Sequence, residues 1–215
     1  MKKIIVPSII ARSQQELNKH LSKVIDLSPI IQLDIMDGKF VKNKSLWFNF
    51  KLPGRPKKAY EAHLMVRDPI SWIKKHASKF DSIIIHAESK NLEQAIKLIK
   101  SKKKKVGIAI NPRTSISKIK SHLKEMNQIT ILAVNPGKYG SKFIPAVLKK
   151  TKALRKLKPS MNIEIDGGLG IANIAKAKQA GANMFISGSY LQNQKTAKRA
   201  KEAYAKLKKV IKCRR

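Results

Sequence analysis

Apolar residues gather in eight short runs that are spaced almost evenly along the chain. The runs are rich in Ile, Val and other strand-forming residues, and polar, Gly or Pro residues bound them. Runs of this length and composition predict β-strands that are buried on both faces. The expected strands span residues 4–9, 30–36, 59–65, 82–88, 105–110, 129–134, 162–167 and 183–188.

Most of the segments between these runs carry apolar residues three and four positions apart, which predicts amphipathic helices. In the last of them, Ala200, Tyr204, Leu207 and Ile211 fall on one helical face. The segment 42–58 differs, because its two prolines and one glycine predict a short helix or none. The expected helices span residues 13–25, 91–102, 115–126, 143–157 and 194–212.

The alternation of strands and helices over 215 residues is typical of an α/β protein with a single-domain (β/α)8 TIM barrel. No linker rich in Gly, Ser or Pro divides the chain. We therefore expect one barrel over residues 1–212, followed by a short basic tail at 213–215. A doubly wound open sheet is the alternative, because it also alternates strands with helices.

Polar side chains fall toward the carboxyl ends of several expected strands, where barrel enzymes hold their active sites. Side chains alternate along a strand, so residues two apart share one side. The residues that share a side or end a strand are Ser8; Gln32, Asp34 and Met36; Glu61, His63 and Met65; His86 and Glu88; Glu164 and Asp166. Because the chain has only 13 acidic residues, this grouping predicts a catalytic mouth.

Two glycine-containing turns follow the last two expected strands. They place Gly167, Gly168, Gly188 and Ser189 where backbone N–H groups can bind a phosphate, as these loops often do in barrels. The turns therefore predict a phosphate-bearing substrate.

Asp34 and Asp166 belong to strands that lie nearly opposite each other in a ring of eight. One carboxylate could remove a carbon-bound proton while the other returns a proton to the opposite face, which inverts that centre. The charge that develops needs electrostatic stabilisation. A metal held by His63 and the two aspartates would supply it as a Lewis acid.

The chain carries 47 basic residues and a formal net charge of +34, and only 6% of its residues are aromatic. Nucleic-acid surfaces favour arginine and interleaved aromatic residues, whereas the basic residues here are mostly lysine. We interpret them as a solvated surface and expect any nucleic-acid binding to be non-specific. The interrupted apolar start and the single cysteine, Cys213, predict a cytoplasmic protein without membrane contact.

Three stretches stand out: "LDIMDGKFVKN" at 33–43, "AHLMV" at 62–66 and "IEIDGG" at 163–168. Five more are "VPSII" (6–10), "IHAE" (85–88), "GIAINPRT" (107–114), "VNPGKYGSKF" (134–143) and "SGS" (187–189). Together, at these spacings, they resemble the ribulose-phosphate 3-epimerase family.

The resemblance implies a barrel of the ribulose-phosphate-binding type that interconverts D-ribulose 5-phosphate and D-xylulose 5-phosphate through an enediolate. It implies a divalent metal (Zn, Mn, Mg or Fe), a role in the pentose phosphate pathway and, because such barrels are often oligomers, a homo-oligomer. Asp34 and Asp166 become the proton acceptor and donor and, with His63, the metal ligands. The implied substrate contacts are Ser8, His63, Met36, Met65, Gly137, Lys138, Tyr139, Gly140, Gly167, Gly168, Gly188 and Ser189.

The chain departs from the family pattern at one ligand position, where Gln32 replaces a histidine. A glutamine carbonyl is a poorer zinc ligand than imidazole and suits harder ions. The site could therefore bind zinc weakly, prefer manganese or magnesium, or work without a metal. The family lid reads Gly137-Lys138-Tyr139-Gly140 here, and Leu132 replaces a methionine.

Two other functions remain open at this point. The altered lid admits a 3-epimerase that acts on another ketose phosphate, such as a ketohexose 6-phosphate. The second alternative, motivated by Gln32 and the net charge, is a degenerate barrel that serves as a basic nucleic-acid-binding module. Of the remaining polar residues, we expect Asp37 to shape a turn before Gly38, and His86 and Glu88 to form a hydrogen-bonded pair that lines the pocket.

Overall fold

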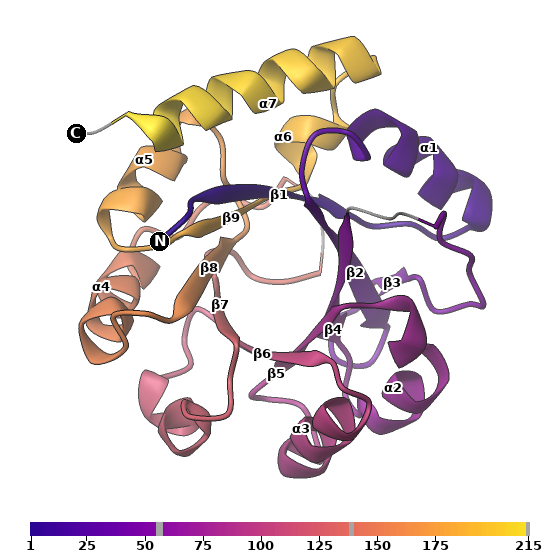
Figure 1. Ribbon diagram of the computed structural model, residues 1–215, viewed down its shortest axis with the longest axis vertical. Coiled ribbons are helices and arrows are strands. Elements are labelled where there is room, and N and C mark those ends of the chain that lie inside the picture. Colours follow the sequence, from indigo (N-terminus) through magenta and orange to yellow (C-terminus); the bar gives the residue numbers. More distant parts are fainter. Residues whose placement is uncertain (55–57, 138–139, 214–215) are drawn as a thin grey trace.

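The computed structural model describes residues 1–54, 58–137 and 140–213. Within these ranges the chain forms a ring of parallel strands surrounded by helices (Figure 1). The parallel strands are β1 (Ile4–Ile9), β2 (Ile30–Asp37), β4 (Ala59–Met65), β5 (Ser82–His86), β6 (Lys105–Ile110), β7 (Gln128–Leu132), β8 (Asn162–Asp166) and β9 (Met184–Ser187). The two-residue β3 (Lys44–Ser45) pairs antiparallel with the end of β2.

The ring closes through β1, which pairs in parallel with β9 on one side and with β2 on the other. In the β1–β2 pair, Ser8 lies opposite Gln32 and Ile9 opposite Leu33. An open doubly wound sheet would have two free edges, so this closure excludes it. The structure thus confirms the single-domain (β/α)8 barrel expected from the sequence.

The helices lie outside the ring (Figure 1). They are α1 (Gln14–Val24), α2 (Ile70–His76), α3 (Leu92–Ser101), α4 (Val147–Leu157), α5 (Ile171–Gln179), α6 (Ser189–Gln192) and α7 (Ala197–Lys212), with 3₁₀ helices η1 (Ala77–Lys79) and η2 (Ile116–His122). Side-chain caps fix the starts of α1 and α7, because Ser13 accepts a hydrogen bond from Glu16 N and Thr196 accepts one from Arg199 N. No helix in the described part of the chain is long and apolar enough to cross a membrane.

Two of the expected helices differ from what forms. The segment 115–126 folds as the 3₁₀ helix η2, in which residues three apart eclipse. Ile116 and Ile119 have this spacing, and both pack on the core. The expected helix 194–212 forms as α7, which begins at Ala197 because Thr196 caps it, and the short α6 before it was not expected.

The main apolar core lies between the ring and the helices. On α7, the expected face is buried, with Ala200 and Leu207 at 0% exposure and Tyr204 and Ile211 below 10%. Burial of such side chains stabilises the fold by about 1.5–3 kcal/mol each. Because the apolar core occupies the space outside the ring, the ring interior is free to carry polar side chains.

One buried histidine in this outer layer predicts a pH-dependent stability. His76 is 4% exposed, and its ring stacks on Phe50 with 5.4 Å between centroids. Burial, together with the charges of Lys79 and Lys75, lowers the pKa of His76 to about 4. The unfolded chain, with a histidine pKa of about 6.5, therefore binds a proton that the folded chain excludes.

We expect the stabilisation from neutral His76 to be complete above pH 6.5 and to be lost as the pH falls toward 4. The loss is about 1–2 kcal/mol after allowance for solvent screening. Urea unfolding at pH 7 and pH 4.5 measures it, and His76→Phe should lose less unfolding free energy between the two pH values than wild type. Equal losses in both proteins would contradict the prediction.

Candidate active site

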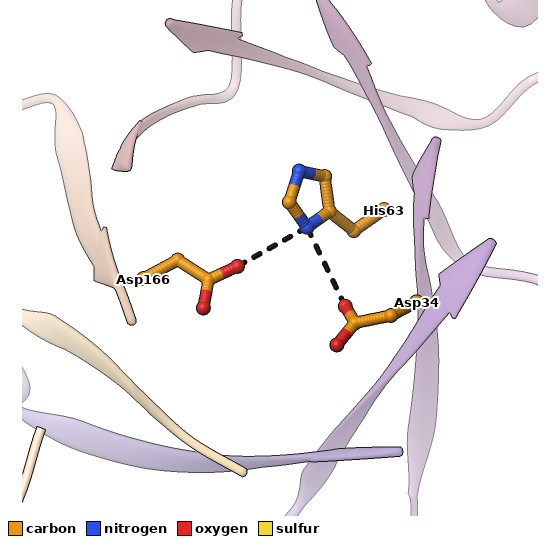
Figure 2. Close-up of side chains that lie close together, drawn as sticks. All are labelled: Asp34, His63 and Asp166. Atoms are coloured by element: carbon orange, nitrogen blue, oxygen red, sulfur yellow. Dashed lines mark ion pairs between the residues drawn. The ribbon is translucent and has the colours of Figure 1, made fainter. Parts of the chain in front are cut away.

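Three side chains from different strands meet at the carboxyl-terminal end of the ring. Figure 2 shows Asp34 of β2 and Asp166 of β8 facing one nitrogen of His63 on β4. His63 Nδ1 lies 3.4 Å from Asp34 Oδ1 and 3.1 Å from Asp166 Oδ2. The potential ligand atoms of the three residues all lie within 4.8 Å of one another. Two carboxylates and one imidazole at this separation could hold a metal ion.

Gln32 completes this group from the layer of β2 below Asp34. Its Nε2 donates to Asp34 Oδ1 at 2.8 Å and to Asp166 Oδ2 at 3.1 Å, and it lies 3.4 Å from His63 Nδ1. Its Oε1 is buried and, within the described residues, has no hydrogen-bond partner. The amide therefore bridges the two aspartates through its nitrogen and leaves its oxygen unsatisfied.

Burial and mutual contact shift the proton affinities of this group. Burial raises the pKa of Asp34, and the nearby Asp166 charge adds to the rise. Burial alone would lower the pKa of His63, but hydrogen bonds to Asp166 and Asp34, and their charges, raise it to about 10. The two carboxylates therefore oppose the effect of burial on His63.

A pocket opens directly above Asp34 and Asp166. Most of the residues that the sequence assigned to the substrate line it: Ser8, Met36, Met65, Gly137, Gly140, Gly167, Gly168, Gly188 and Ser189. His63 and Gln32 lie beneath the floor of the pocket, at 0% exposure. Lys138 and Tyr139 lie outside the described residues.

The two glycine-containing turns form one side of this pocket. Gly167 and Gly168 follow β8 with φ of +106° and +65°, conformations that L side chains rarely adopt. A Cβ on Gly168 would lie 2.8 Å from the backbone of Phe143. Gly188 and Ser189 stand at the start of α6. Close packing and positive φ thus require glycine in the turn after β8, and both glycines line the pocket.

Asp37 has the structural role that we expected. Its Oδ1 accepts hydrogen bonds from Lys39 N and Phe40 N, and its Oδ2 accepts one from Arg67 N, each at 2.8 Å. These bonds hold the turn after β2 against the turn after β4. Asp37 therefore does not belong to the group around His63.

The expected pair of His86 and Glu88 forms, but it does not line the pocket. His86 Nδ1 lies 3.2 Å from Glu88 Oε2, and His86 Nε2 lies 2.9 Å from His63 Nε2. The pair therefore stands behind His63, on the side away from the aspartates. Glu88 lies two residues beyond the end of β5, where the alternation of the strand no longer holds.

The ring interior below the site holds Glu61 and Glu164, which the sequence grouped with the residues of the catalytic mouth. Glu61 accepts from Ser82 Oγ at 2.9 Å, and Glu164 accepts from Thr130 Oγ1 at 2.8 Å. Burial raises the pKa of Glu61 and of Glu164. Their two-residue spacing from His63 and Asp166 placed them on the correct side of their strands, but neither lines the pocket, so the expectation that they belong to the catalytic mouth was wrong.

Comparison of the sequence with known proteins identifies the family of this chain. The sequence pattern of the ribulose-phosphate 3 epimerase family matches residues 4–192. The ribulose-phosphate 3-epimerase of Buchnera aphidicola is 35% identical over 210 residues, which cover 90% of this chain and 90% of that protein. The enzyme of the same name from Eremothecium gossypii is 32% identical over 205 residues, which cover 88% of this chain and 86% of that protein.

Comparison of structures finds the same architecture in more distant proteins. The 3-keto-L-gulonate-6-phosphate decarboxylase of Vibrio cholerae superposes with a TM-score of 0.70 at 14% identity, over 99% of this chain and 98% of that chain. At this identity the likeness concerns the fold alone.

Proposed function

We propose that this chain, which belongs to the ribulose-phosphate 3-epimerase family and is therefore an isomerase, interconverts D-ribulose 5-phosphate and D-xylulose 5-phosphate. The observation that carries the proposal is the pair of aspartates, Asp34 and Asp166, which reach the floor of one pocket from separate strands. Epimerisation at a carbon next to a carbonyl needs two acid–base groups of this kind.

In the proposed reaction, Asp34 takes the proton from C3 of D-ribulose 5-phosphate and Asp166 delivers a proton to the opposite face. Burial raises the pKa of Asp34, which makes it a stronger base than an exposed aspartate. The electrons of the broken C–H bond pass into the neighbouring carbonyl and form an enediolate. Protonation of C3 from the other side restores the carbonyl with C3 inverted.

The remaining pocket residues hold the substrate in this orientation. Backbone N–H groups at Gly167, Gly168, Gly188 and Ser189 are suited to bind the phosphate. Met36 and Met65, which line the pocket beside Asp34, keep water away from the enediolate. A substrate fixed by its phosphate then presents C3 between the two aspartates.

The residues around His63 fit a divalent metal. Asp34, His63 and Asp166 offer three ligand atoms, and Gln32 offers a fourth, because its buried Oε1 has no hydrogen-bond partner among the described residues. A half-turn of the amide exchanges this oxygen with Nε2, which already lies beside both carboxylates. A metal bound there would supply Lewis-acid stabilisation of the enediolate charge.

Turnover of D-ribulose 5-phosphate by the purified chain tests the proposed function. The chain is stripped of metal and assayed with zinc, manganese, magnesium or no addition. Formation of D-xylulose 5-phosphate is the expected result. If the chain converted a ketohexose 6-phosphate but not the pentose phosphate, the ketohexose 6-phosphate would be the substrate instead. No turnover of either compound under any condition would refute the proposed function.

The donor set also predicts a metal preference. Three oxygen ligands and one imidazole favour a hard ion such as Mn²⁺ over Zn²⁺ more than a site with two imidazoles does. We expect Gln32→His to strengthen zinc binding about 10-fold or more relative to manganese. Titration of metal-stripped protein against a chelator of known affinity measures this ratio, and an unchanged ratio would contradict the assignment of Gln32 as a ligand.

A further inference from the structure

A row of three side chains leads from the candidate metal site to the outer end of β5. His63 Nε2 faces His86 Nε2 at 2.9 Å, and His86 Nδ1 faces Glu88 Oε2 at 3.2 Å. Both histidines have 0% exposure, and their ring planes lie within 15° of each other. The proposed reaction uses the Nδ1 side of His63 and gives no role to His86 or Glu88.

The hydrogen bonds of this row fix where its protons lie. An ionised carboxylate only accepts hydrogen bonds, so His86 Nδ1 must carry a proton and donate it to Glu88. A neutral imidazole has one donor and one acceptor nitrogen, which leaves His86 Nε2 as an acceptor. The nitrogen that faces it, His63 Nε2, must then be the donor.

We propose that Glu88 is a positioning residue that, through His86, keeps a proton on His63 Nε2 and reserves His63 Nδ1 for the site shared with Asp34 and Asp166. With Nε2 protonated, Nδ1 is the nitrogen that can offer a lone pair to a metal. The proton placement stands on hydrogen bonds alone. Only its consequence for metal binding rests on the proposed function.

The other oxygen of Glu88 makes the inference testable without deletion of a side chain. Glu88 Oε1 accepts hydrogen bonds from Asn111 N at 3.0 Å and from Thr114 Oγ1. In Glu88→Gln, these two donors hold the amide oxygen in the same place. The amide NH₂ group must then occupy the position of Oε2, where it faces His86 Nδ1 and needs an acceptor.

The substitution therefore changes which ring nitrogen carries the proton in each histidine of the row. His86 Nδ1 becomes the acceptor, and the proton of His86 moves to Nε2. His63 Nε2 must then accept, so the proton of His63 is confined to Nδ1. That nitrogen can no longer offer a lone pair to a metal unless the new hydrogen bonds break.

The experiment compares the full chain with its Glu88→Gln and Glu125→Gln variants. Glu125 is an exposed carboxylate that pairs with Lys100 at 2.7 Å, so its substitution controls for the loss of one negative charge. Long-range ¹H–¹⁵N spectra of histidine-labelled protein report which ring nitrogens carry protons. Binding of Mn²⁺ to the metal-stripped proteins is measured in parallel.

In wild type and Glu125→Gln we expect protonated His86 Nδ1 and protonated His63 Nε2. In Glu88→Gln we expect protonated His86 Nε2, unprotonated His63 Nε2 and Mn²⁺ affinity weaker by about 10- to 100-fold. A wild-type spectrum with the proton on His86 Nε2 would overturn the inference by itself, even if the variant failed to fold. Unchanged proton positions in a folded Glu88→Gln would overturn it as well.

Two further outcomes separate this inference from the proposed function. Reversed protons with unchanged Mn²⁺ affinity would overturn the role of Glu88 in metal binding. Wild-type protein that binds no metal, yet shows the expected proton positions and their reversal, would count against the metal site while it supports the proton placement.

Discussion

Substitution of either aspartate by asparagine is expected to lower kcat for epimerisation by about 10²- to 10⁴-fold, because each removes one of the two groups that move the proton. Asp34→Asn and Asp166→Asn keep the size of the side chain, so the barrel should remain folded. The measurement is conversion of D-ribulose 5-phosphate to D-xylulose 5-phosphate. Asp26→Asn is the control, since Asp26 pairs with Lys58 on the surface at 3.0 Å.

Isotope exchange in D₂O separates the two roles. With Asp166→Asn, Asp34 can still remove the C3 proton of D-ribulose 5-phosphate and return deuterium to the same face. We therefore expect exchange without inversion in this variant, and no exchange from D-ribulose 5-phosphate in Asp34→Asn. Wild-type turnover in both variants, or exchange that is the same in both, would contradict the two-aspartate reaction.

Replacement of Gly168 by alanine is expected to damage both the fold and the binding of phosphate. The new Cβ would lie 2.8 Å from the backbone N and Cα of Phe143 at a φ of +65°, so the turn must move. Backbone strain of this kind costs about 1–3 kcal/mol. Loss of one hydrogen bond to a charged phosphate costs about 1.5–3 kcal/mol, which raises KM roughly 10- to 100-fold.

Gly181→Ala supplies a matched control for this prediction. Gly181 has a φ of +103°, and a Cβ there would lie 2.8 Å from the Arg155 side chain, at the end of α5 and away from the pocket. Both variants should lose unfolding free energy in urea, but only Gly168→Ala should raise KM. An unchanged KM in Gly168→Ala would show that this turn does not hold the phosphate.

The strands and their order could be predicted from sequence because a strand that is buried on both faces appears as a continuous apolar run. Residues 106–110, for example, carry no polar side chain, and the structure forms a strand over Lys105–Ile110. Alternation within a strand also predicted which residues share a side, so Asp34 and His63 were placed together correctly. The 3₁₀ helix η2 was not predicted, because apolar residues three apart suit an α-helix and a 3₁₀ helix alike.

The hydrogen bonds within the site could not be predicted in the same way. The direction of the Gln32 amide depends in part on an acceptor on β8, Asp166, which is 134 residues away in the chain. The position of Glu88 depends on the turn after β5, where the alternation of the strand no longer holds. Alternation gives the face of a residue, but donors and acceptors from separate strands decide what it contacts.

The closure of the ring through β1 has a consequence for the order in which the chain is made. β1 leaves the ribosome before the other strands of the ring, yet residues Ile4 to Pro7 pair with Met184 to Ser187 of β9. One edge of β1 therefore has no partner until most of the chain has been synthesised. Until then, that edge can hydrogen-bond to other exposed strands, which makes the early part of the nascent chain prone to aggregation.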